Sequence, residues 1–244
     1  MWMTDWKILG ANLGIDFEVP VIYKEASYKI SSSTPGSGYN SYSVSDEHFG
    51  LGDIKLEPLL LSWHWKHFDA MTAYALWVPT GEFSAGSLVN LGDDEWTHMI
   101  TLGGVWYPAD KNSWAVSILQ HYEFNSSQVG AISSSSGPGA GGGYAQIPSY
   151  QKIPCSVYTL EWGISKTVLN NTDAGLFGYY QKQFTDGSQA TTVYKNSEVA
   201  GIGPEISTLI PLWNLSASLR YAYEFSAYNR PQGQTLNLTL TKKF

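Results

Sequence analysis

The chain has 244 residues and a formal net charge of −7, which argues against nucleic acid as a partner because phosphate binding needs a basic surface. It contains no uncharged apolar run of about eighteen residues, so a membrane-spanning helix is excluded. Charged residues make up only 14 % of the chain, while aromatic residues also reach 14 %, with ten Trp and sixteen Tyr. Few charges with many aromatic rings are typical of proteins at a membrane interface.

The first residues of the chain bear on its cellular compartment, and the single cysteine bears on disulfide formation. The first residues, MWMTDWKILG, lack the basic segment and apolar core of a secretory signal. We therefore expect a mature or N-terminally shortened chain, or else a compartment other than the one that the strands indicate. Cys155 is alone, so no internal disulfide can form.

The first third of the chain predicts two strands separated by a loop. From Leu9 to Val21, apolar residues alternate with polar ones that include Asp16 and Glu18. Residues 31–48 are rich in Ser, Gly and Asn, and predict a long loop. The next segment, 49–64, puts Ile54 and Leu56 on one face and Asp53, Lys55 and Glu57 on the other, with a bulge expected at Pro58.

The middle of the chain repeats this alternation. We predict strands at 70–79, 95–108, 114–125, 156–166, 174–184 and 197–210. The segment 126–154 is too flexible and polar to pack a core. The last residues form a hairpin around RPQG, with alternating faces in 215–229 and 234–244.

The connections between these strands alternate between long and short. About ten strands of roughly ten residues each, with tight turns at one end and long loops at the other, are typical of an outer-membrane barrel. We therefore predict an all-β fold: one antiparallel transmembrane up-and-down β-barrel domain spanning residues 1–244. A soluble β-sandwich, in which the aromatic residues fill a core, is the alternative.

Aromatic residues collect near both ends of the predicted strands, as they do in the girdles of membrane barrels. One predicted girdle lies by the short turns and comprises Trp63, Trp65, Trp106, Trp114 and Trp213. The other lies toward the long loops and comprises Tyr122, Phe124, Tyr158, Tyr223 and Phe225.

Several motifs resemble those of one bacterial family. They are FGLGDI (49–54), WVPTGEF (77–83), EWGISK (161–166), GIGPEI (201–206), LRYAYEF (219–225), RPQG (230–233) and the ending LTLTKKF (238–244). From residue 10 onward the sequence resembles the "MetA-pathway of phenol degradation" family, whose members are outer-membrane transporters of Gram-negative bacteria. The resemblance implies uptake of aromatic compounds, a signal peptide and further sequence before this stretch, and about twelve strands in an intact barrel.

The ending also resembles the assembly signal of outer-membrane proteins, a terminal aromatic residue preceded by alternating hydrophobic residues. Here the matching positions are Leu236, Leu238, Leu240 and Phe244. Lys242 interrupts the alternation, and a lysine near the interface can extend its ammonium to water. The resemblance implies that the barrel assembly machinery is a partner.

The predicted inner face carries most of the charge. The candidate lumen residues are Asp16, Glu18, Asp53, Lys55, Glu57, His121, Glu123, Glu161, Glu205, Arg220 and Glu224. Charges at membrane depth are tolerated where they face water or one another. These side chains could form a filter that disfavours anions, or a salt-bridge network that plugs a narrow barrel. The position of Arg220 near Glu205 and Glu224 favours the plug slightly.

Catalytic motifs are weak in this sequence. His121 and Glu123 share a face and could form an acid–base pair, although a hydrogen bond in the lumen is the simpler interpretation. His64 and His67 lie beside Asp69 at a predicted turn, where interfacial polar residues are common. The sequence contains no H-E-x-x-H, G-x-S-x-G or P-loop motif. We predict no enzyme activity, no cofactor and no metal.

The predicted function is passive passage of small hydrophobic or aromatic solutes across the bacterial outer membrane. The expected partners are outer-membrane lipid, the solute and the assembly machinery. The second hypothesis is a structural or adhesive barrel with a packed, non-conducting lumen. The third is a barrel enzyme acting on lipid or peptide.

Overall fold

The fold was analysed in a computed structural model, which describes residues 1–34, 38–84, 87, 89–109, 113–128, 136–138, 144–146, 155–185, 197–230 and 232–242. These residues form strands and one short 3-10 helix, Pro211–Trp213. Within this part of the chain, no helix is long and apolar enough to cross a membrane.

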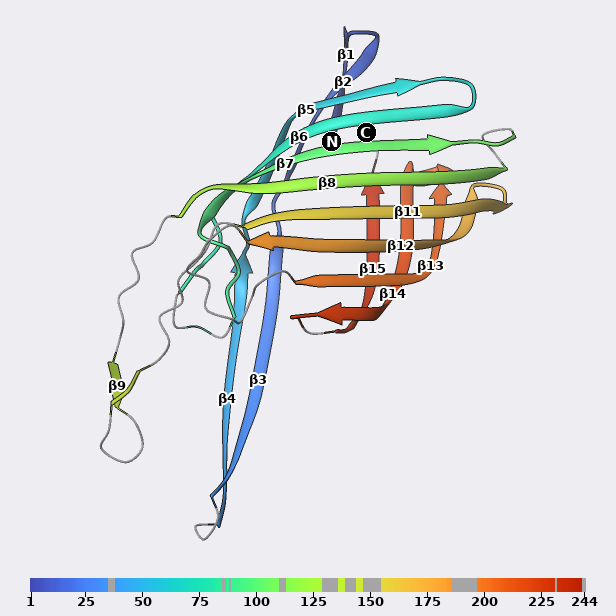
Figure 1. The fold of residues 1–244 in the computed structure, drawn as a ribbon. Coiled ribbons are helices and arrows are strands. Elements are labelled where there is room, and N and C mark those ends of the chain that lie inside the picture. The colour runs from blue at the N-terminus through green and yellow to red at the C-terminus, as the bar shows by residue number, and fades with distance from the viewer. Residues whose placement is uncertain are drawn as a thin grey trace.

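One large antiparallel sheet contains eleven of the described strands. In spatial order they are β1 (Trp2–Ile8), β2 (Ala11–Glu18), β5 (Ile54–His64), β6 (Phe68–Val78), β7 (Glu95–Trp106), β8 (Trp114–Gln128), β11 (Cys155–Leu169), β12 (Thr172–Thr185), β13 (Glu198–Ile210), β14 (Leu215–Tyr228) and β15 (Gln234–Lys242). Spatial order follows chain order, which is an up-and-down topology. Figure 1 shows the sheet curling, with β5 to β12 crossing the view, β13 and β14 bending into a steep direction, and β15 standing steeply behind them.

Two further pairs of strands lie outside this sheet. β3 (Val21–Thr34) and β4 (Gly38–Leu51) form a long hairpin, and β9 (Ser136–Pro138) pairs with β10 (Tyr144–Gln146). Figure 1 shows the β3–β4 hairpin projecting far beyond the sheet, roughly in line with β2.

The short connections are tight turns in which Gly or Asn occupies the left-handed positions, with Leu9 as the exception. Leu9 and Gly10 join β1 to β2 with φ angles of 51° and 79°. Asn171, with φ of 65°, lies in the turn between β11 and β12, and Asn214, with φ of 46°, ends the turn between β13 and β14. Asn and Gly adopt this left-handed conformation at low cost, which explains their presence at these positions.

Two parts of the N-terminal third differ from the sequence-based prediction. The predicted strand 9–21 is β2 together with the start of β3, and β1 precedes it unpredicted. The predicted loop at 31–48 is wrong, because its described residues continue the ladder that runs from the Val21–Leu51 pair to the Thr34–Gly38 pair. The physical reason is that ladder hydrogen bonds come from the backbone, and Ser, Thr and Tyr side chains tolerate the extended conformation well.

The bulge expected at Pro58 is confirmed. The register between β5 and β6 shifts between Leu56 and Leu59, the stretch that contains Pro58. Proline has no backbone N–H to donate to the ladder, so an irregularity in the pairing is needed there.

The sheet has one uncovered apolar face and one covered face with small and polar residues. In β13, Val199, Gly201 and Gly203 are buried, whereas Ile202 and Ile206 between and beyond them are exposed. In β7, Met99 and Thr101 are buried, and their neighbours Ile100 and Leu102 are exposed. Within the described part of the chain no second layer covers the apolar side. This pattern is typical of a sheet whose outer face contacts lipid.

Close approach of β13 and β14 depends on Gly203, because a Cβ there would overlap the carbonyl oxygen of Tyr221. We predict that Gly203→Ala separates these strands and costs about 1–3 kcal/mol of stability. The measurement is the temperature at which the compact, fast-migrating form disappears from unboiled electrophoresis samples.

The matched control is Gly233→Ala, since a Cβ at Gly233 would meet only an oxygen of the Glu224 carboxylate, at 3.8 Å. This variant should unfold at the temperature of the unmodified protein. Equal unfolding temperatures for Gly203→Ala and the unmodified protein would contradict the close approach.

Candidate functional site

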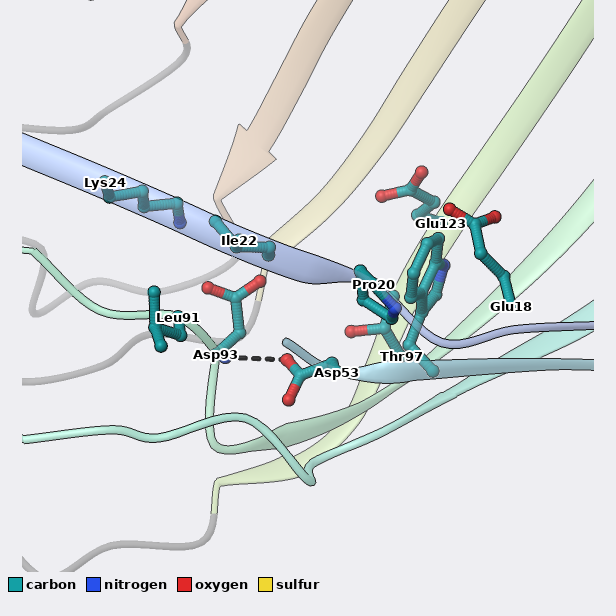
Figure 2. A pocket seen from close by; sticks show the side chains of 10 residues that line it. Glu18, Pro20, Ile22, Lys24, Asp53, Leu91, Asp93, Thr97 and Glu123 are labelled. Atoms are coloured by element: carbon teal, nitrogen blue, oxygen red, sulfur yellow. Dashed lines mark hydrogen bonds between the residues drawn. The ribbon is translucent and has the colours of Figure 1, made fainter. Parts of the chain in front are cut away.

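A cavity of about 370 Å³ lies where the long connections meet the sheet. It is lined by Glu18, Pro20, Ile22, Lys24, Asp53, Trp77, Leu91, Asp93, Thr97 and Glu123. Figure 2 shows the lining side chains, which come from the β2–β3 junction, the β4–β5 junction, the connection between β6 and β7, and the strands β6, β7 and β8. The cavity therefore lies at the loop end of the sheet.

Asp53 fixes the shape of this cavity by holding the connection between β6 and β7. Its carboxylate accepts hydrogen bonds from the backbone N–H of Gly81 at 2.9 Å and of Asp93 at 2.7 Å (Figure 2 shows the second). Thr80 adds a hydrogen bond from its hydroxyl to the carbonyl of Gly52 at 3.1 Å. The connection is thus tied to the β4–β5 junction, and Asp53 contributes to architecture as well as charge.

The same connection is also tied to the β3–β4 hairpin. Lys24 donates to the carbonyl of Asn90 at 2.7 Å, and Ser87 donates to the Asp46 carboxylate at 2.5 Å. His48 lies 3.3 Å from Asp46 and 3.6 Å from Glu82. The hairpin and the connection therefore build one wall of the cavity together.

The lining combines apolar surface with excess negative charge. Four carboxylates, those of Glu18, Asp53, Asp93 and Glu123, face one ammonium group, that of Lys24. Trp77 supplies an aromatic ring. Glu123 has no hydrogen-bond or salt-bridge partner among the described residues. Such a lining suits a solute with an apolar body and no negative charge, because carboxylates repel anions and a ring face attracts cations.

Further candidate residues form an ion-paired cluster around Lys55. Its ammonium lies 3.6 Å from Asp16 and 3.4 Å from Glu18, and 6.0 Å from the ring centre of Trp77. Glu57 pairs in register with Asp16, and its side chain is only 7 % exposed. Lys55 therefore neutralises part of the charge just below the cavity.

A second cluster surrounds Arg220 on β14. Its Nε lies 3.0 Å from Glu205 on β13, and its Nη1 lies 3.9 Å from Glu161 on β11. The guanidinium also stands 5.1 Å from the ring centre of Phe177 on β12. Adjacent strands are about 4.8 Å apart, so contact across three strand spacings requires strong curvature toward this side. Arg220 therefore lies on the concave face of the sheet.

Glu224 belongs to a separate cluster, so the expected proximity of Arg220 and Glu224 is not found. Glu224 accepts hydrogen bonds from the Tyr179 hydroxyl at 3.0 Å and from the backbone N–H of Gly233 at 2.6 Å. Its cationic neighbour is Arg230, at 3.9 Å. The reason is the turn after β14, which brings Arg230, Gln232 and Gly233 back over the end of that strand.

His121 and Glu123 lie on the same face of β8 but do not contact each other. His121 Nδ1 lies 2.9 Å from the hydroxyl oxygen of Thr101. Glu123 lines the cavity instead. The geometry thus gives the two residues separate environments and provides no support for an acid–base pair.

The aromatic residues of the two predicted girdles lie on the outer side of the sheet. Trp106, Trp114, Trp213, Tyr122, Tyr223 and Phe225 are exposed. Trp63 is partly covered, and its indole N–H donates to the carbonyl of Leu9 at 3.2 Å. Their role as membrane girdles stays a prediction.

Within the predicted assembly signal, Leu236, Leu238 and Leu240 are exposed along β15. Phe244 lies outside the described residues. The Lys242 ammonium donates to the carbonyl of Trp213 at the neighbouring short turn. The Lys242 ammonium therefore lies at the end of the sheet, and the exposed apolar side chains of β15 are the leucines.

Part of the site lies on two segments that the sequence patterns predicted as a loop or did not assign. Ile22 and Lys24 come from β3, while Leu91 and Asp93 come from the connection before β7. One available signal was the alternation of Val21, Tyr23 and Glu25 with Ile22 and Lys24, which continues the pattern of β2 past Pro20. The contribution of the connection had no such signal.

A polar cluster at the short-turn end was only partly anticipated. Tyr107 donates from its hydroxyl to Asp69 at 2.9 Å, and His64 Nδ1 lies 3.1 Å from the same carboxylate. His67 contacts the carbonyls of Tyr107 and Ala109 instead. Burial and the bond to Asp69 raise the pKa of the Tyr107 phenol to about 12.

An antiparallel up-and-down sheet with an uncovered apolar face and charged clusters on its concave face defines a β-barrel of the outer-membrane type. Residues 1–240 match the protein family described as "Putative MetA-pathway of phenol degradation", and the chain belongs to this family. The family resemblance of the sequence motifs is thereby confirmed. No curated protein matches the chain.

A solved structure shares the fold. It is the crystal structure of an outer membrane channel from Pseudomonas putida F1, with 13 % sequence identity and a TM-score of 0.59. The similarity covers 95 % of this chain and 86 % of that one. The predicted fold class, an antiparallel transmembrane up-and-down β-barrel, is confirmed.

The raised pKa of Tyr107 predicts a pH effect at the short-turn end. In the unfolded chain a tyrosine ionises near pH 10, about two units below its folded pKa. The stabilisation from the protonated phenol is therefore complete below about pH 10 and is lost as the pH rises toward about 12. The free energy of unfolding should fall over this window less steeply in Tyr107→Phe than in the unmodified protein.

Absorbance of tyrosinate offers a direct check of the same value. The difference titration between the unmodified protein and Tyr107→Phe should show one phenol ionising well above the exposed tyrosines. A difference titration centred near pH 10 would show that Asp69 does not hold the proton on Tyr107.

Proposed function

We propose that this chain is a channel of the bacterial outer membrane that gives passive passage to small solutes with a hydrophobic or aromatic body. The observation that carries this proposal is the cavity at the loop end, where Trp77, Ile22 and Leu91 stand beside four carboxylates. The carboxylates repel anions, so neutral and cationic aromatic molecules are the preferred solutes. The reference to phenol degradation in the family description supports aromatic solutes, and the P. putida protein of the same fold is described as an outer membrane channel.

A solute that moves along the concave face would pass the clusters around Lys55 and Arg220, whose charges are already paired. Paired charges hold their positions and contribute less net field than free ones. The unpaired Glu123 carboxylate is therefore the group expected to act most strongly on a passing ion. Catalysis is no part of the proposal.

The proposal extends to the surroundings of the barrel. Outer-membrane lipid contacts the exposed apolar face, and the barrel assembly machinery recognises the ending that contains Leu236, Leu238, Leu240 and Phe244. Both follow from the uncovered apolar side of the sheet and the alternating terminal sequence.

A second candidate is a barrel with a packed, non-conducting lumen and a structural or adhesive role. The observation that favours it is the Arg220 cluster, which joins β11, β13 and β14 by ion pairs across the concave face. Side chains linked in this way can fill a narrow barrel.

Conductance in planar bilayers separates the two candidates. We predict ion current through the purified full-length chain, with potassium more permeant than chloride. Benzylammonium should carry current more readily than benzoate, because only the anion is repelled by the cavity. A silent bilayer, recorded with protein that shows the compact form before boiling, would favour the packed lumen.

Removing one charge from the cavity tests its role in selectivity. A unit charge at about 4 Å in water contributes about 1 kcal/mol, attractive for potassium and repulsive for chloride, which together correspond to roughly a thirtyfold change in their relative permeability. Glu123→Gln should therefore lower the potassium-to-chloride permeability ratio by up to about this factor. The measurement is the reversal potential in a potassium chloride gradient.

Glu25→Gln is the matched control, because Glu25 lies on the β3–β4 hairpin and does not line the cavity. Its reversal potential should equal that of the unmodified protein. Equal shifts in both variants would mean that overall charge, and not the cavity, sets selectivity.

A further inference from the structure

The β3–β4 hairpin continues both faces of the barrel wall beyond the large sheet. Glu18, Pro20, Ile22 and Lys24 all line the cavity, so every second residue from β2 into β3 faces the same side. Side chains alternate along an extended chain, and Val19, Val21 and Tyr23 therefore continue the outward face of β2. The hairpin begins as an extension of the wall.

Four large side chains cover the outward face at the base of this hairpin. Val21 pairs in register with Leu51, and Tyr23 pairs with Phe49. Their exposed fractions are 64 % and 52 % for the first pair, and 59 % and 74 % for the second. We call this set the outer apolar patch.

The opposite face of the hairpin is covered by the chain itself. Lys24, Asp46 and His48 contact the connection between β6 and β7, as described above. The outer apolar patch is therefore exposed on a hairpin that is already anchored, and it adjoins the exposed Phe17 and Leu56, which pair in register on β2 and β5.

The tilt of the strands sets the height of the patch. In register, Trp63 at the short-turn end of β5 aligns through β6 and β7 with Ile118 on β8. Ile118 lies four residues beyond Trp114, which marks the short-turn end of β8. A line through paired residues therefore shifts toward the loop end by about four residues in passing from β5 to β8. This shift is expected for strands tilted by roughly 40° from the barrel axis.

The same slope places the patch at the level of the second girdle. Phe124 of that girdle aligns in register with Leu56 on β5 and Phe17 on β2. On β5, the point at the height of Phe124 lies about four residues nearer the loop end than Leu56, which is near residue 52. On β2, it lies about five residues nearer the loop end than Phe17, which is near residue 22. Residue 22 lies between Val21 and Tyr23 of the outer apolar patch, and residue 52 is the neighbour of Leu51 in the same patch.

The side chains beyond the patch change abruptly to carboxylates. Glu25 and Glu47 pair in register one step further along the same face. The Tyr23 hydroxyl donates toward both carboxylates, at 3.3 Å and 3.2 Å. An aromatic residue with its polar end directed at charged groups is the arrangement found at the boundary between lipid and water.

We propose that the outer apolar patch lies in the outer leaflet and packs against lipid acyl chains, with the water boundary between the Tyr23–Phe49 pair and the Glu25–Glu47 pair. The occupant is lipid because the patch continues the lipid-facing surface of the barrel at girdle height. Four side chains also present far less area than the roughly 800 Å² per partner of a stable protein interface. The inference rests on the transmembrane fold and is independent of channel activity.

Spin labels at single cysteines test this placement in the full chain. In a Cys155→Ser background, labels at Val21→Cys and Phe49→Cys report on the patch, and a label at Glu47→Cys is the matched control two residues away. The protein is reconstituted in phosphatidylcholine vesicles, and collision rates with oxygen and with a water-soluble nickel complex are measured. The patch labels should show a ratio of oxygen to nickel collisions several-fold above that of the control.

Each alternative gives a distinct result. Equal ratios at Phe49→Cys and Glu47→Cys would place the patch in water and overturn the proposal. Spin–spin broadening that disappears on dilution with unlabelled protein would identify a second copy as the occupant and also overturn it. Heat-dependent migration of every variant confirms folding, and conductance recorded from the same vesicles separates failure of this proposal from failure of the channel.

Discussion

Hydrocarbon offers no hydrogen bonds, so a chain that crosses a membrane must pair every backbone N–H and C=O within the protein. The ladders of the large sheet supply these hydrogen bonds between each strand and the next, from β1 to β15. Where the sequence interferes, the structure adapts locally: Pro58 lies within a bulge, and Gly203 lets the carbonyl of Tyr221 approach closely. The outer residues then need only be apolar, and the inner ones are free to vary.

Charge on the concave face is distributed unevenly, and this distribution gives the inner face its character. Lys55 holds two carboxylates on β2, and Arg220 holds one on β13 and one on β11. At the loop end, four carboxylates and one ammonium group line the cavity. Asp53 accepts hydrogen bonds from backbone N–H groups, and Glu123 has no partner among the described residues, so neither carboxylate is neutralised by a cation. Charges on the concave face are paired, whereas the cavity at the loop end is net negative. This arrangement is compatible with selection against anions at the cavity.

Alternation of residue types was sufficient to predict most strands of the large sheet from β2 onward. The facing of β5, β8 and β11 could be predicted because their apolar and polar residues separate cleanly. The β3–β4 hairpin was missed because Ser and Gly dominate 31–48, and composition is a poor guide where backbone pairing alone holds two strands together. The partners of Glu224 depend on the turn after β14, which brings Arg230 and Gly233 to its carboxylate, and residue patterns do not reveal this turn. The cavity depends on Leu91 and Asp93, whose positions are set by tertiary contacts to Asp53.

The order of the strands bears on how the chain reaches this state. Each strand of the large sheet pairs with the strand that precedes it in that sheet, so most contacts join strands that are close in the sequence. Folding can proceed by adding one hairpin at a time to a growing edge, without waiting for distant segments to meet. The entropic cost of closing a connection rises by only about 0.6 kcal/mol for each doubling of its length. The long connections are therefore the parts of this protein that evolution can enlarge or exchange at little cost, while the wall that carries them stays the same.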